Sequence, residues 1–253
     1  MIPSLQAAFL TTPIAHRGYH DLSANCPENS LSAFRRAVDA GYGIELDVQQ
    51  SADGEAMVFH DDFLRRLTVH EGAIAERTAA QLGKIALNHS STDMIPTLAE
   101  VLAVVAGRVA VLIELKTNWD TMLPTDGGLE RAVARALTGY QGPVALMAFN
   151  PHCVAEMALL APHLPRGLTT DPYDYAANAQ IPQATCDRLR EIPDYDATGS
   201  CFISHQAADL GRPRVAELKA QGAVVLCWTI RSPLAEAEAR KIAHNVTFEG
   251  YAA

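Results

Sequence analysis

Short apolar runs rich in branched residues alternate with segments of helical periodicity along almost the whole chain. In Ser30–Ala40, for example, Leu31, Phe34 and Val38 recur at the spacing of one helix face, and Gly41 follows as a stop signal. This alternation favours a parallel sheet whose strands are joined by crossover helices. The expected strands are Pro13–His16, Ile44–Val48, Met57–His60, Val109–Lys116, Val144–Phe149, Gly167–Thr170, Cys201–Ser204, Val224–Thr229 and Asn245–Phe248. The expected helices are Ser30–Ala40, Leu98–Ala106, Gly128–Leu137, His152–Leu160, Arg212–Gln221 and Pro233–Ala243.

About eight strand–helix units in 253 residues match the size of a (β/α)8 TIM barrel, which is the predicted fold class. A doubly wound open sheet is the alternative. The segment Asp171–Gly199, of mixed Pro, Tyr and Asp character, is expected to be a loop with one short helix. Since no linker or composition break divides the chain, residues 1–253 are expected to form a single domain.

The formal net charge of −9 argues against general nucleic-acid binding, but not against a small anion held in a local basic pocket. The five cysteines are odd in number, widely spaced and without a CxxC pair, so a disulfide framework is not expected. The N-terminus lacks the features of a signal peptide, and no apolar run reaches the length of a transmembrane segment. These features predict a cytoplasmic location.

Charged residues gather where several expected strands end. His16, Glu45, Asp47, Glu114 and Lys116 all lie at or near the C-terminal halves of strands. Residues one apart in a strand share a face, so Glu45 and Asp47 point the same way. The C-terminal ends of the strands form the catalytic face of a barrel, and several charges at core-facing positions require a joint explanation.

A hairpin can bring a further histidine to this cluster. The Asp53-Gly54 pair is a strong turn signal, and the segment is too short for a crossover helix. If the chain folds back about this pair, Asp47 lies directly opposite His60 and shares its face. A register shift of one residue would defeat this pairing.

The residue types favour metal-assisted chemistry on a phosphate ester. Three carboxylates with water and a substrate oxygen suit Mg²⁺ or Ca²⁺, and an all-oxygen set suits zinc less well. Lys116 and Arg17 supply cations for phosphate oxygens. One histidine would remove a proton from the nucleophile while the other protonates the leaving oxygen. Glu114 and Lys116 could alternatively form only a structural ion pair.

Seven short motifs follow one another along the chain. They are His16-Arg17-Gly18, Pro27-Glu28-Asn29-Ser30, Glu45-x-Asp47, His60-Asp61, Ile95-Pro96-Thr97-Leu98, Glu114-x-Lys116 and Trp228-Thr229. In this order they resemble the motifs of the glycerophosphodiester phosphodiesterases, in particular the cytosolic bacterial type, a phospholipase C-like phosphodiesterase barrel. The similarity extends from about Ile14 to Phe248.

The resemblance implies a TIM barrel that uses Mg²⁺ or Ca²⁺ to hydrolyse a small-molecule glycerophosphodiester to glycerol 3-phosphate and an alcohol. It implies that His16 is the general base and His60 the general acid. It also implies that Glu45, Asp47 and Glu114 are the metal ligands. In this family the glycerol hydroxyl is thought to attack first, and the residues alone do not distinguish that route from direct attack by water.

The remaining implied roles concern the substrate. Arg17 and Lys116 would hold the phosphate, and Glu28 and Asn29 would lie near the metal. Trp228 would shape the substrate pocket, although a place in the core is as well supported by its type.

The chain also departs from the family pattern. Many members end in a Thr-Asp-x-Pro signature, where this chain has Thr247-Phe248-Glu249-Gly250. Glu249 either takes the place of that aspartate or lies in a strand that only closes the barrel. Asp61 either orients His60 or faces solvent, and His205 ends a strand from which it could reach the active-site face.

Two other functions remain open. A lysophospholipase D-type enzyme could use the same side chains on a lipid substrate, and a non-catalytic binding protein could use the same fold. Loss of metal-dependent activity in His16→Ala and His60→Ala, with folding retained, would separate a catalyst from a binding protein.

Overall fold

The strands of the protein close into a ring. In the computed structural model, which describes residues 2–253, the first strand pairs in parallel with both the second and the last, so the two edges of the sheet meet. The other neighbours are parallel too, except that a short third strand pairs antiparallel with the second. The predicted (β/α)8 barrel is therefore confirmed and the open sheet is excluded. The strands are β1 (Ile14–Ala15), β2 (Gly43–Gln50), β3 (Ala56–Val58), β4 (Val111–Leu115), β5 (Val144–Ala148), β6 (Arg166–Thr170), β7 (Phe202–Gln206), β8 (Val224–Ile230) and β9 (Asn245–Phe248).

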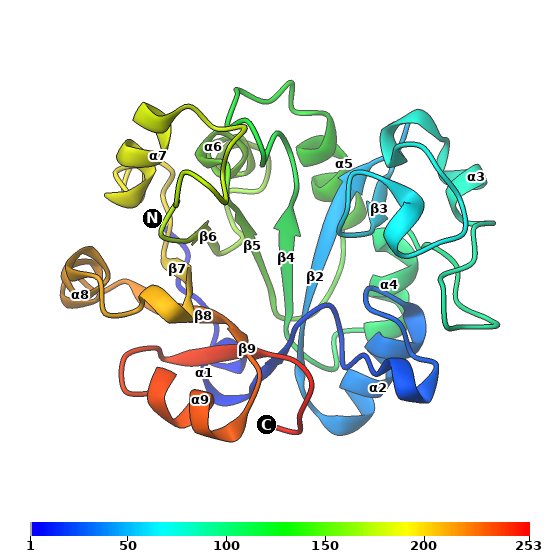
Figure 1. The fold of residues 1–253 in the computed structure, drawn as a ribbon, viewed down its shortest axis with the longest axis horizontal. Helices are drawn as coiled ribbons and strands as arrows, with labels where there is room; N and C mark the ends of the chain where they lie inside the picture. Colours follow the sequence, from blue (N-terminus) through cyan, green and yellow to red (C-terminus); the bar gives the residue numbers. More distant parts are fainter. Residues whose placement is uncertain (1) are drawn as a thin grey trace.

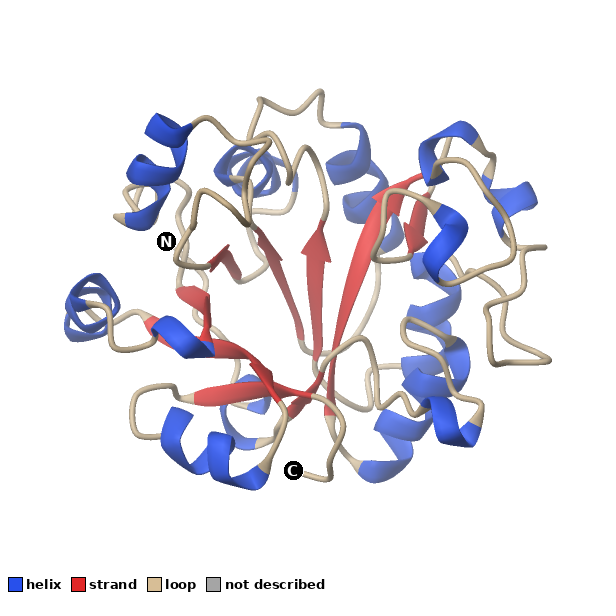
Figure 2. Ribbon diagram, in the orientation of Figure 1, coloured by secondary structure: helices blue, strands red, loops and turns tan. Residues whose placement is uncertain are grey.

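Helices cover the outside of the ring (Figures 1 and 2). Every helix expected from the sequence is present, and the segment Asp171–Gly199 contains its one short helix, α7. None of the helices between residues 2 and 253 combines the length and apolar character that a membrane crossing requires. The helices are α1 (Ala8–Thr11), α2 (Leu31–Ala40), α3 (Ala79–Leu82), α4 (Leu98–Val105), α5 (Gly128–Ala136), α6 (Pro151–Leu160), α7 (Gln183–Arg190), α8 (Pro213–Ala220) and α9 (Pro233–Ala239). Single 3-10 turns lie at Leu22–Ala24, Leu64–Arg66, Ile74–Glu76 and Ala207–Asp209.

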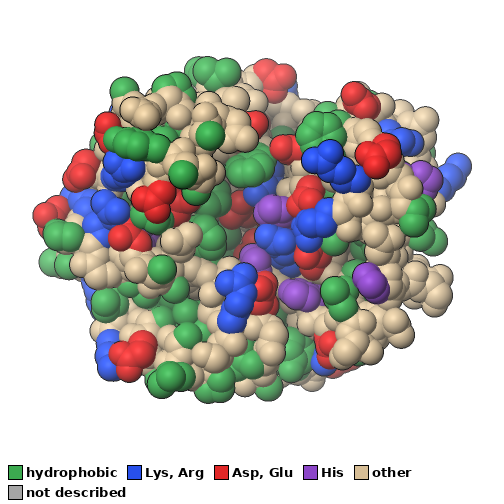
Figure 3. Space-filling view, in the orientation of Figure 1, with side chains coloured by type: hydrophobic (Ala, Val, Ile, Leu, Met, Phe, Trp, Pro, Cys, Tyr) green, Lys and Arg blue, Asp and Glu red, His purple; other side chains and the backbone are tan. Residues whose placement is uncertain are grey.

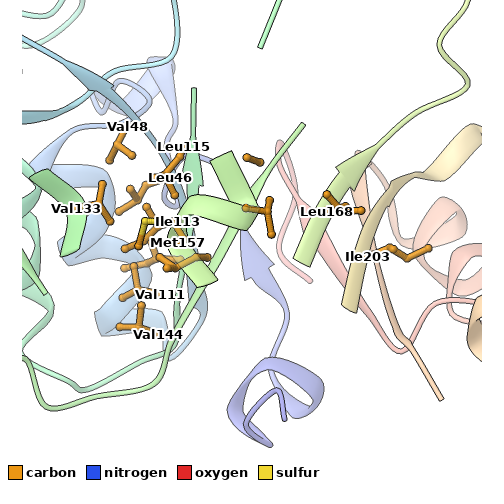
Figure 4. Close-up of a cluster of buried hydrophobic side chains, with 14 of the residues drawn as sticks. Leu46, Val48, Val111, Ile113, Leu115, Val133, Val144, Met157, Leu168 and Ile203 are labelled. Carbon is orange, nitrogen blue, oxygen red and sulfur yellow. The ribbon is translucent and has the colours of Figure 1, made fainter. Parts of the chain in front are cut away.

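Side-chain alternation along the strands separates an outer from an inner layer. Leu46 and Val48 of β2 point outward into the large apolar cluster between strands and helices. Figure 4 shows them beside Val133 of α5 and Met157 of α6. Since neighbouring strand residues point to opposite faces, the residues between them, such as Asp47, point into the barrel.

The N-terminal end of the barrel is filled with apolar side chains. Ile14 and Phe202 face inward there and pack with Phe9 of α1. Asn245 is buried at the start of β9, and its Nδ2 donates to the carbonyls of Phe9 (2.8 Å) and Thr12 (2.6 Å). Helix α1, which was not expected from the sequence, therefore closes this end, and the polar pocket lies toward the opposite end.

The segment 59–97 builds a small apolar cluster of its own beside β2 and β3, in cyan and green at the right of Figure 1. Phe59, Leu64 and Ile74 are fully buried in it. This cluster holds the 3-10 turn Leu64–Arg66 against the side of the barrel.

The hairpin between β2 and β3 forms, but its predicted register is wrong by one residue. Val48 pairs with Val58, and the amide of Phe59 donates to the carbonyl of Asp47 (3.1 Å), so Asp47 lies opposite Phe59 and not opposite His60. The connection is longer than a two-residue turn, because the amide of Ser51 bonds the carbonyl of Glu55. His60 instead reaches the pocket from the turn that follows β3.

Candidate active site

One pocket at the C-terminal end of the barrel brings together the eight side chains for which the sequence predicts a catalytic, metal-binding or substrate-binding role. They come from the ends of β1, β2, β4 and β8 and from the turn after β3. In Figure 3, histidine, basic and acidic side chains gather near the middle of this face of the molecule. The pocket is lined by His16, Arg17, Glu45, Asp47, His60, Glu114, Lys116, Met147, Phe149, Trp228 and Thr247.

Three buried carboxylates form the floor of this pocket. Asp47 and Glu114 are directly paired neighbours on β2 and β4, and Glu45 lies two residues before Asp47 on the same inward face. Each offers an oxygen within 4.8 Å of the others. Burial raises the pKa of Glu45 well above its usual range, and the charge of Asp47 raises it further. Burial also raises the pKa of Asp47, but His60, Arg17 and Lys116 outweigh it and keep that pKa well below its usual range.

This donor set fits a divalent cation. All three groups are hard oxygen ligands, which Mg²⁺ and Ca²⁺ prefer. Burial also raises the pKa of Glu114, against the opposing charge of Lys116. Burying several carboxylates together is unfavourable unless positive charge compensates them. The cluster of Glu45, Asp47 and Glu114 can therefore hold a metal ion.

The turn after β1 presents Arg17 to the carboxylates. Arg17 has a φ of 54°, in the left-handed region, and its amide donates to Glu45 Oε2 (2.9 Å). Its guanidinium bonds Glu28 Oε1 (2.7 Å) and lies 3.4 Å from Asp47 Oδ2 through Nε. That Nε is buried and has no hydrogen-bond partner among residues 2–253. Gly18 follows with a φ of 81°, and an added Cβ there would lie 2.9 Å from Ala33 Cβ.

Asn29 supports the same corner of the pocket. Its backbone is left-handed as well, with a φ of 52°, and its amide donates to the carbonyl of Arg17 (2.9 Å). Its Nδ2 donates to Asp47 Oδ2 (2.9 Å). Asn29 thus contacts Asp47 directly and Glu28 contacts Arg17, and their expected place near a metal ion stays a prediction.

His16 is held by a carboxylate that directly follows the last strand. Its Nδ1 lies 2.5 Å from Glu249 Oε2, and Glu249 Oε1 accepts from Arg231 Nε (2.7 Å). Burial lowers the pKa of His16, and the hydrogen bond with Glu249 opposes that shift. The same bond keeps the pKa of Glu249 well below its usual range. With Nδ1 occupied as a donor to a carboxylate, Nε2 is the atom of His16 left to accept a proton.

His60 is held in the same way by its neighbour. Its Nδ1 lies 2.7 Å from Asp61 Oδ1, and its Nε2 lies 3.3 Å from Lys116 Nζ. Lys116 Nζ also donates to Glu114 Oε1 (3.3 Å) and sits 4.2 Å from the ring centre of Trp119. Of the two interpretations of Asp61, the contact with His60 supports orientation of the ring.

Aromatic side chains line the other side of the pocket. The Phe149 and Trp228 rings meet edge to face at 5.6 Å, and Trp228 Nε1 donates to the carbonyl of Ser204 (3.0 Å). His205 does not line the pocket. Phe202 and Ser204 of β7 face the inside of the barrel, so His205, which lies between Ser204 and the end of the strand, faces the helix layer. There it bonds Thr170 Oγ1 (2.7 Å).

Several residues in or near the pocket were not singled out in the sequence, among them Met147, Phe149 and Thr247 of its lining and the neighbouring Arg66 and Trp119. Arg66 joins Glu28 and Asp61, and Trp119 packs beside Lys116 and donates to Asp62 Oδ1 (3.2 Å). Both lie in irregular segments where neither helical nor strand periodicity signals a position. Arg66 also lies in a stretch with a second arginine, so its type alone did not distinguish it.

The fold and this pocket together define a (β/α)8 barrel enzyme whose site lies at the C-terminal ends of its strands. The model of the glycerophosphoryl diester phosphodiesterase family matches residues 16–248. The chain belongs to this family, and the expectation of an enzyme of the phosphodiesterase class is confirmed at the family level.

Individual relatives agree with this assignment. A glycerophosphodiester phosphodiesterase from Caldanaerobacter subterraneus subsp. tengcongensis is 35% identical over 167 residues, which is 62% of this chain and 66% of the relative. One from Bacillus altitudinis is 31% identical over 64% of this chain and 67% of its own length. The alignment thus spans about two thirds of these relatives.

Solved structures show the same barrel over more of the chain. A phosphodiesterase from Oleispira antarctica, in complex with the product sn-glycerol-3-phosphate, has a TM-score of 0.76 and 25% identity, and the match covers 96% of this chain and 94% of that one. A glycerophosphodiester phosphodiesterase from Thermotoga maritima has a TM-score of 0.71 at 22% identity and 94% coverage of both chains, and supports the fold alone.

Proposed function

We propose that the protein hydrolyses glycerophosphodiesters to glycerol 3-phosphate and an alcohol. The observation that carries this proposal is the arrangement of two histidines, His16 and His60, around one pocket with Arg17 and Lys116. Each imidazole is bonded through Nδ1 to a carboxylate, which leaves each Nε2 on the pocket side for proton transfer. The product bound to the Oleispira antarctica relative supports the choice of substrate.

His16 is the general base in this proposal and His60 is the general acid. His16 Nε2 takes the proton of the attacking hydroxyl as its oxygen bonds to phosphorus. The bond from phosphorus to the leaving alcohol breaks, and His60 Nε2 gives its proton to that oxygen. The attacking hydroxyl belongs either to water, which gives glycerol 3-phosphate directly, or to the glycerol of the substrate. In the second case the first product is a cyclic phosphate of glycerol, and water opens it to glycerol 3-phosphate in a second step, in which His60 takes the proton of the water and His16 returns its proton to the glycerol oxygen.

Arg17 and Lys116 bind the phosphate. Within the described part of the chain the buried Arg17 Nε has no hydrogen-bond partner, and a phosphate oxygen would supply one. When Lys116 turns to a phosphate oxygen, His60 Nε2 is released from its contact with Lys116 Nζ (3.3 Å). Phe149 and Trp228 then form the wall against which the organic part of the substrate packs.

Glu45, Asp47 and Glu114 hold the metal, for which we propose Mg²⁺ or Ca²⁺. Such an ion, when bound, stabilises negative charge on the phosphoryl oxygens and lowers the pKa of a coordinated hydroxyl. Lys116 remains beside Glu114 and keeps a second positive charge at the same edge of the pocket.

We further propose that residues 1–253 form one domain and that the protein works in the cytoplasm. Pairing of β1 with both β2 and β9 supports a single barrel, because the first and last strands are then parts of one sheet. The five free thiols, four of them buried, suit a reducing compartment.

The test is release of glycerol 3-phosphate from glycerophosphocholine and glycerophosphoethanolamine in Mg²⁺, in Ca²⁺ and in EDTA. Metal-dependent release is expected, with loss of at least about 100-fold in His16→Ala and His60→Ala, the usual size of a general acid or base contribution. Calorimetric titration of Glu45→Gln with each metal ion separates metal binding from turnover.

Different failures have different meanings. Release that is equal in EDTA would overturn the metal assignment and leave the reaction standing. No release from either diester, followed by cleavage of a lysophospholipid, would favour the lysophospholipase D-type alternative. Inactivity on both classes would favour a binding protein.

A further inference from the structure

Arg66 lies outside the pocket, yet its guanidinium binds two carboxylates at once. Its Nε and Nη2 donate to Asp61 Oδ2 (2.6 Å) and Oδ1 (2.7 Å). Its Nη1 and Nη2 donate to Glu28 Oε2 (3.0 Å) and Oε1 (2.7 Å). Both contacts are two-pronged, which is a geometry that the planar fork of arginine provides and a lysine ammonium does not.

Each of these carboxylates has its second partner inside the pocket. Asp61 Oδ1 lies 2.7 Å from His60 Nδ1, and Glu28 Oε1 accepts from Arg17 Nη1 (2.7 Å). One guanidinium therefore connects His60, in the turn after β3, with Arg17, in the turn after β1. These two turns carry the proposed acid and a proposed phosphate ligand.

Arg66 also helps to lower the pKa of both carboxyls. Burial raises the pKa of Asp61, but hydrogen bonds with His60 and Arg66 outweigh it and hold that pKa well below its usual range. Burial likewise raises the pKa of Glu28, and the bonds from Arg66 and Arg17 bring it below its usual value. An ionised Asp61 accepts the Nδ1 proton of His60 and so keeps Nε2 directed to the pocket.

The 3-10 turn that carries Arg66 is anchored by Leu64. Leu64, two residues earlier, is fully buried in the apolar cluster of segment 59–97, and its amide bonds the carbonyl of Gly72 (3.0 Å). Replacing Arg66 therefore leaves this 3-10 turn anchored. Arg65, in the same turn, is exposed and packs over the ring of Phe63 at 5.6 Å, away from both carboxylates.

We propose that Arg66 is a positioning residue that holds the imidazole of His60 and the guanidinium of Arg17 in one fixed frame. This inference rests on the proposed function. Loss of Arg66 frees Asp61 and Glu28 together, so proton delivery to the leaving alcohol and binding of the phosphate weaken in the same variant.

The experiment compares the wild type with Arg66→Ala, Arg66→Lys and the matched control Arg65→Ala on two substrates. Glycerophosphocholine has an alkyl leaving group that requires a proton, whereas the 4-nitrophenyl diester of glycerol phosphate has a leaving group that departs without one. Circular dichroism and thermal unfolding of each variant report whether the fold is retained.

Arg66→Ala is expected to lower kcat on glycerophosphocholine about 10- to 100-fold, the usual effect of removing a group that orients a reactive side chain. On the nitrophenyl diester its kcat is expected to stay within about threefold of wild type, because His60 is bypassed there. KM is expected to rise on both substrates, because Arg17 is loosened in either case. Arg66→Lys is expected to restore at most one of these two properties, the kcat on glycerophosphocholine or the KM. Arg65→Ala is expected to keep the kcat and KM of the wild type.

Two results would overturn the proposal while the proposed function stands. One is equality of Arg66→Ala and Arg65→Ala in kcat and KM. The other is an equal loss of kcat on both substrates together with a lower unfolding temperature, which marks a merely structural residue.

If the wild type cleaves neither diester, the proposed function fails, and a crystal structure of Arg66→Ala decides the positioning role alone. Displaced His60 and Arg17 side chains would support it, and unmoved ones would refute it.

Discussion

Glu249 is the residue whose replacement most directly tests the role of His16. Its Oε2 lies 2.5 Å from His16 Nδ1, and Arg231 Nε holds its other oxygen at 2.7 Å. The Glu249→Gln variant keeps a neutral acceptor in the same place, whereas Glu249→Ala removes the acceptor. Glu238→Gln is the matched control, because Glu238 is an exposed residue of α9 that pairs with Lys241.

The size of the effect follows from this hydrogen bond. A hydrogen bond to a charged group contributes about 1.5–3 kcal/mol and a neutral one about 0.5–1.5 kcal/mol. If that energy holds the imidazole in its reactive orientation, Glu249→Gln loses about 1–1.5 kcal/mol, which is about 5- to 10-fold in kcat. Glu249→Ala loses the whole contribution, which is about 10- to 150-fold.

The pH dependence of activity is expected to shift in one direction when Glu249 is replaced. Burial lowers the pKa of His16, and the hydrogen bond with Glu249 raises it again in part. A general base works only when it is unprotonated, so activity falls as pH drops through the pKa of His16. Replacing Glu249 removes the carboxylate that raises the pKa of His16, so this pKa falls further. The acidic limb of the profile therefore moves to lower pH in both variants.

The assay is kcat and kcat/KM for glycerophosphodiester hydrolysis at about one-unit steps of pH, with metal at saturation. The role assigned to Glu249 is refuted if both variants keep kcat within twofold of the Glu238→Gln control. A shift of the acidic limb to higher pH would refute the pKa reasoning separately, even if kcat falls.

Three further outcomes are expected. Glu45 has a raised pKa in the folded state, so the metal-free protein should lose stability as pH rises from the unfolded-state pKa of Glu45 through the folded-state one. Mg²⁺ or Ca²⁺ at about 100 times its Kd should raise the free energy of unfolding by about 2.7 kcal/mol near pH 7. Calorimetric unfolding of Glu45→Gln should show no such stabilisation by metal. Gly18→Ala should destabilise the protein by about 1–3 kcal/mol in denaturant titration, because the new Cβ would meet Ala33. The loss should exceed that of Gly139→Ala, because Gly139 has a similar φ but open space around its added Cβ. Equal losses of stability would contradict the steric reason. His205→Gln should leave kcat within about twofold while lowering the unfolding temperature, and a large loss of kcat would place His205 in the reaction after all.

Much of the fold could be predicted because its signals are local. Helix α2 begins at its Ser30 cap and ends at Gly41, and both signals lie within the element itself. Alternation in β2 placed Glu45 and Asp47 on one face, since the side-chain period of a strand is fixed by its backbone. Helix α1 escaped prediction because it is one turn long and depends on Asn245, far along the chain.

The candidate site was predicted in part. The residue types and the family motifs predicted one site made of eight side chains, and the structure places all eight around one pocket. The hairpin register was wrong because the turn contains one residue more than a two-residue turn, and the parity of β7 turned His205 away from the pocket. Arg66 gave no signal, because its partners come from two separate turns.

The sequence by itself determined the strand–helix order, the common face of Glu45 and Asp47 and the kinds of side chain at the strand ends, because these depend on neighbours close along the chain. Only the tertiary structure decided which carboxylate holds each histidine and which guanidinium joins the turn after β1 to the turn after β3. The contact between His16 and Glu249 spans 233 positions and exists only because β9 closes the ring against β1. Ring closure depends on the packing of every strand in between, which no local pattern records.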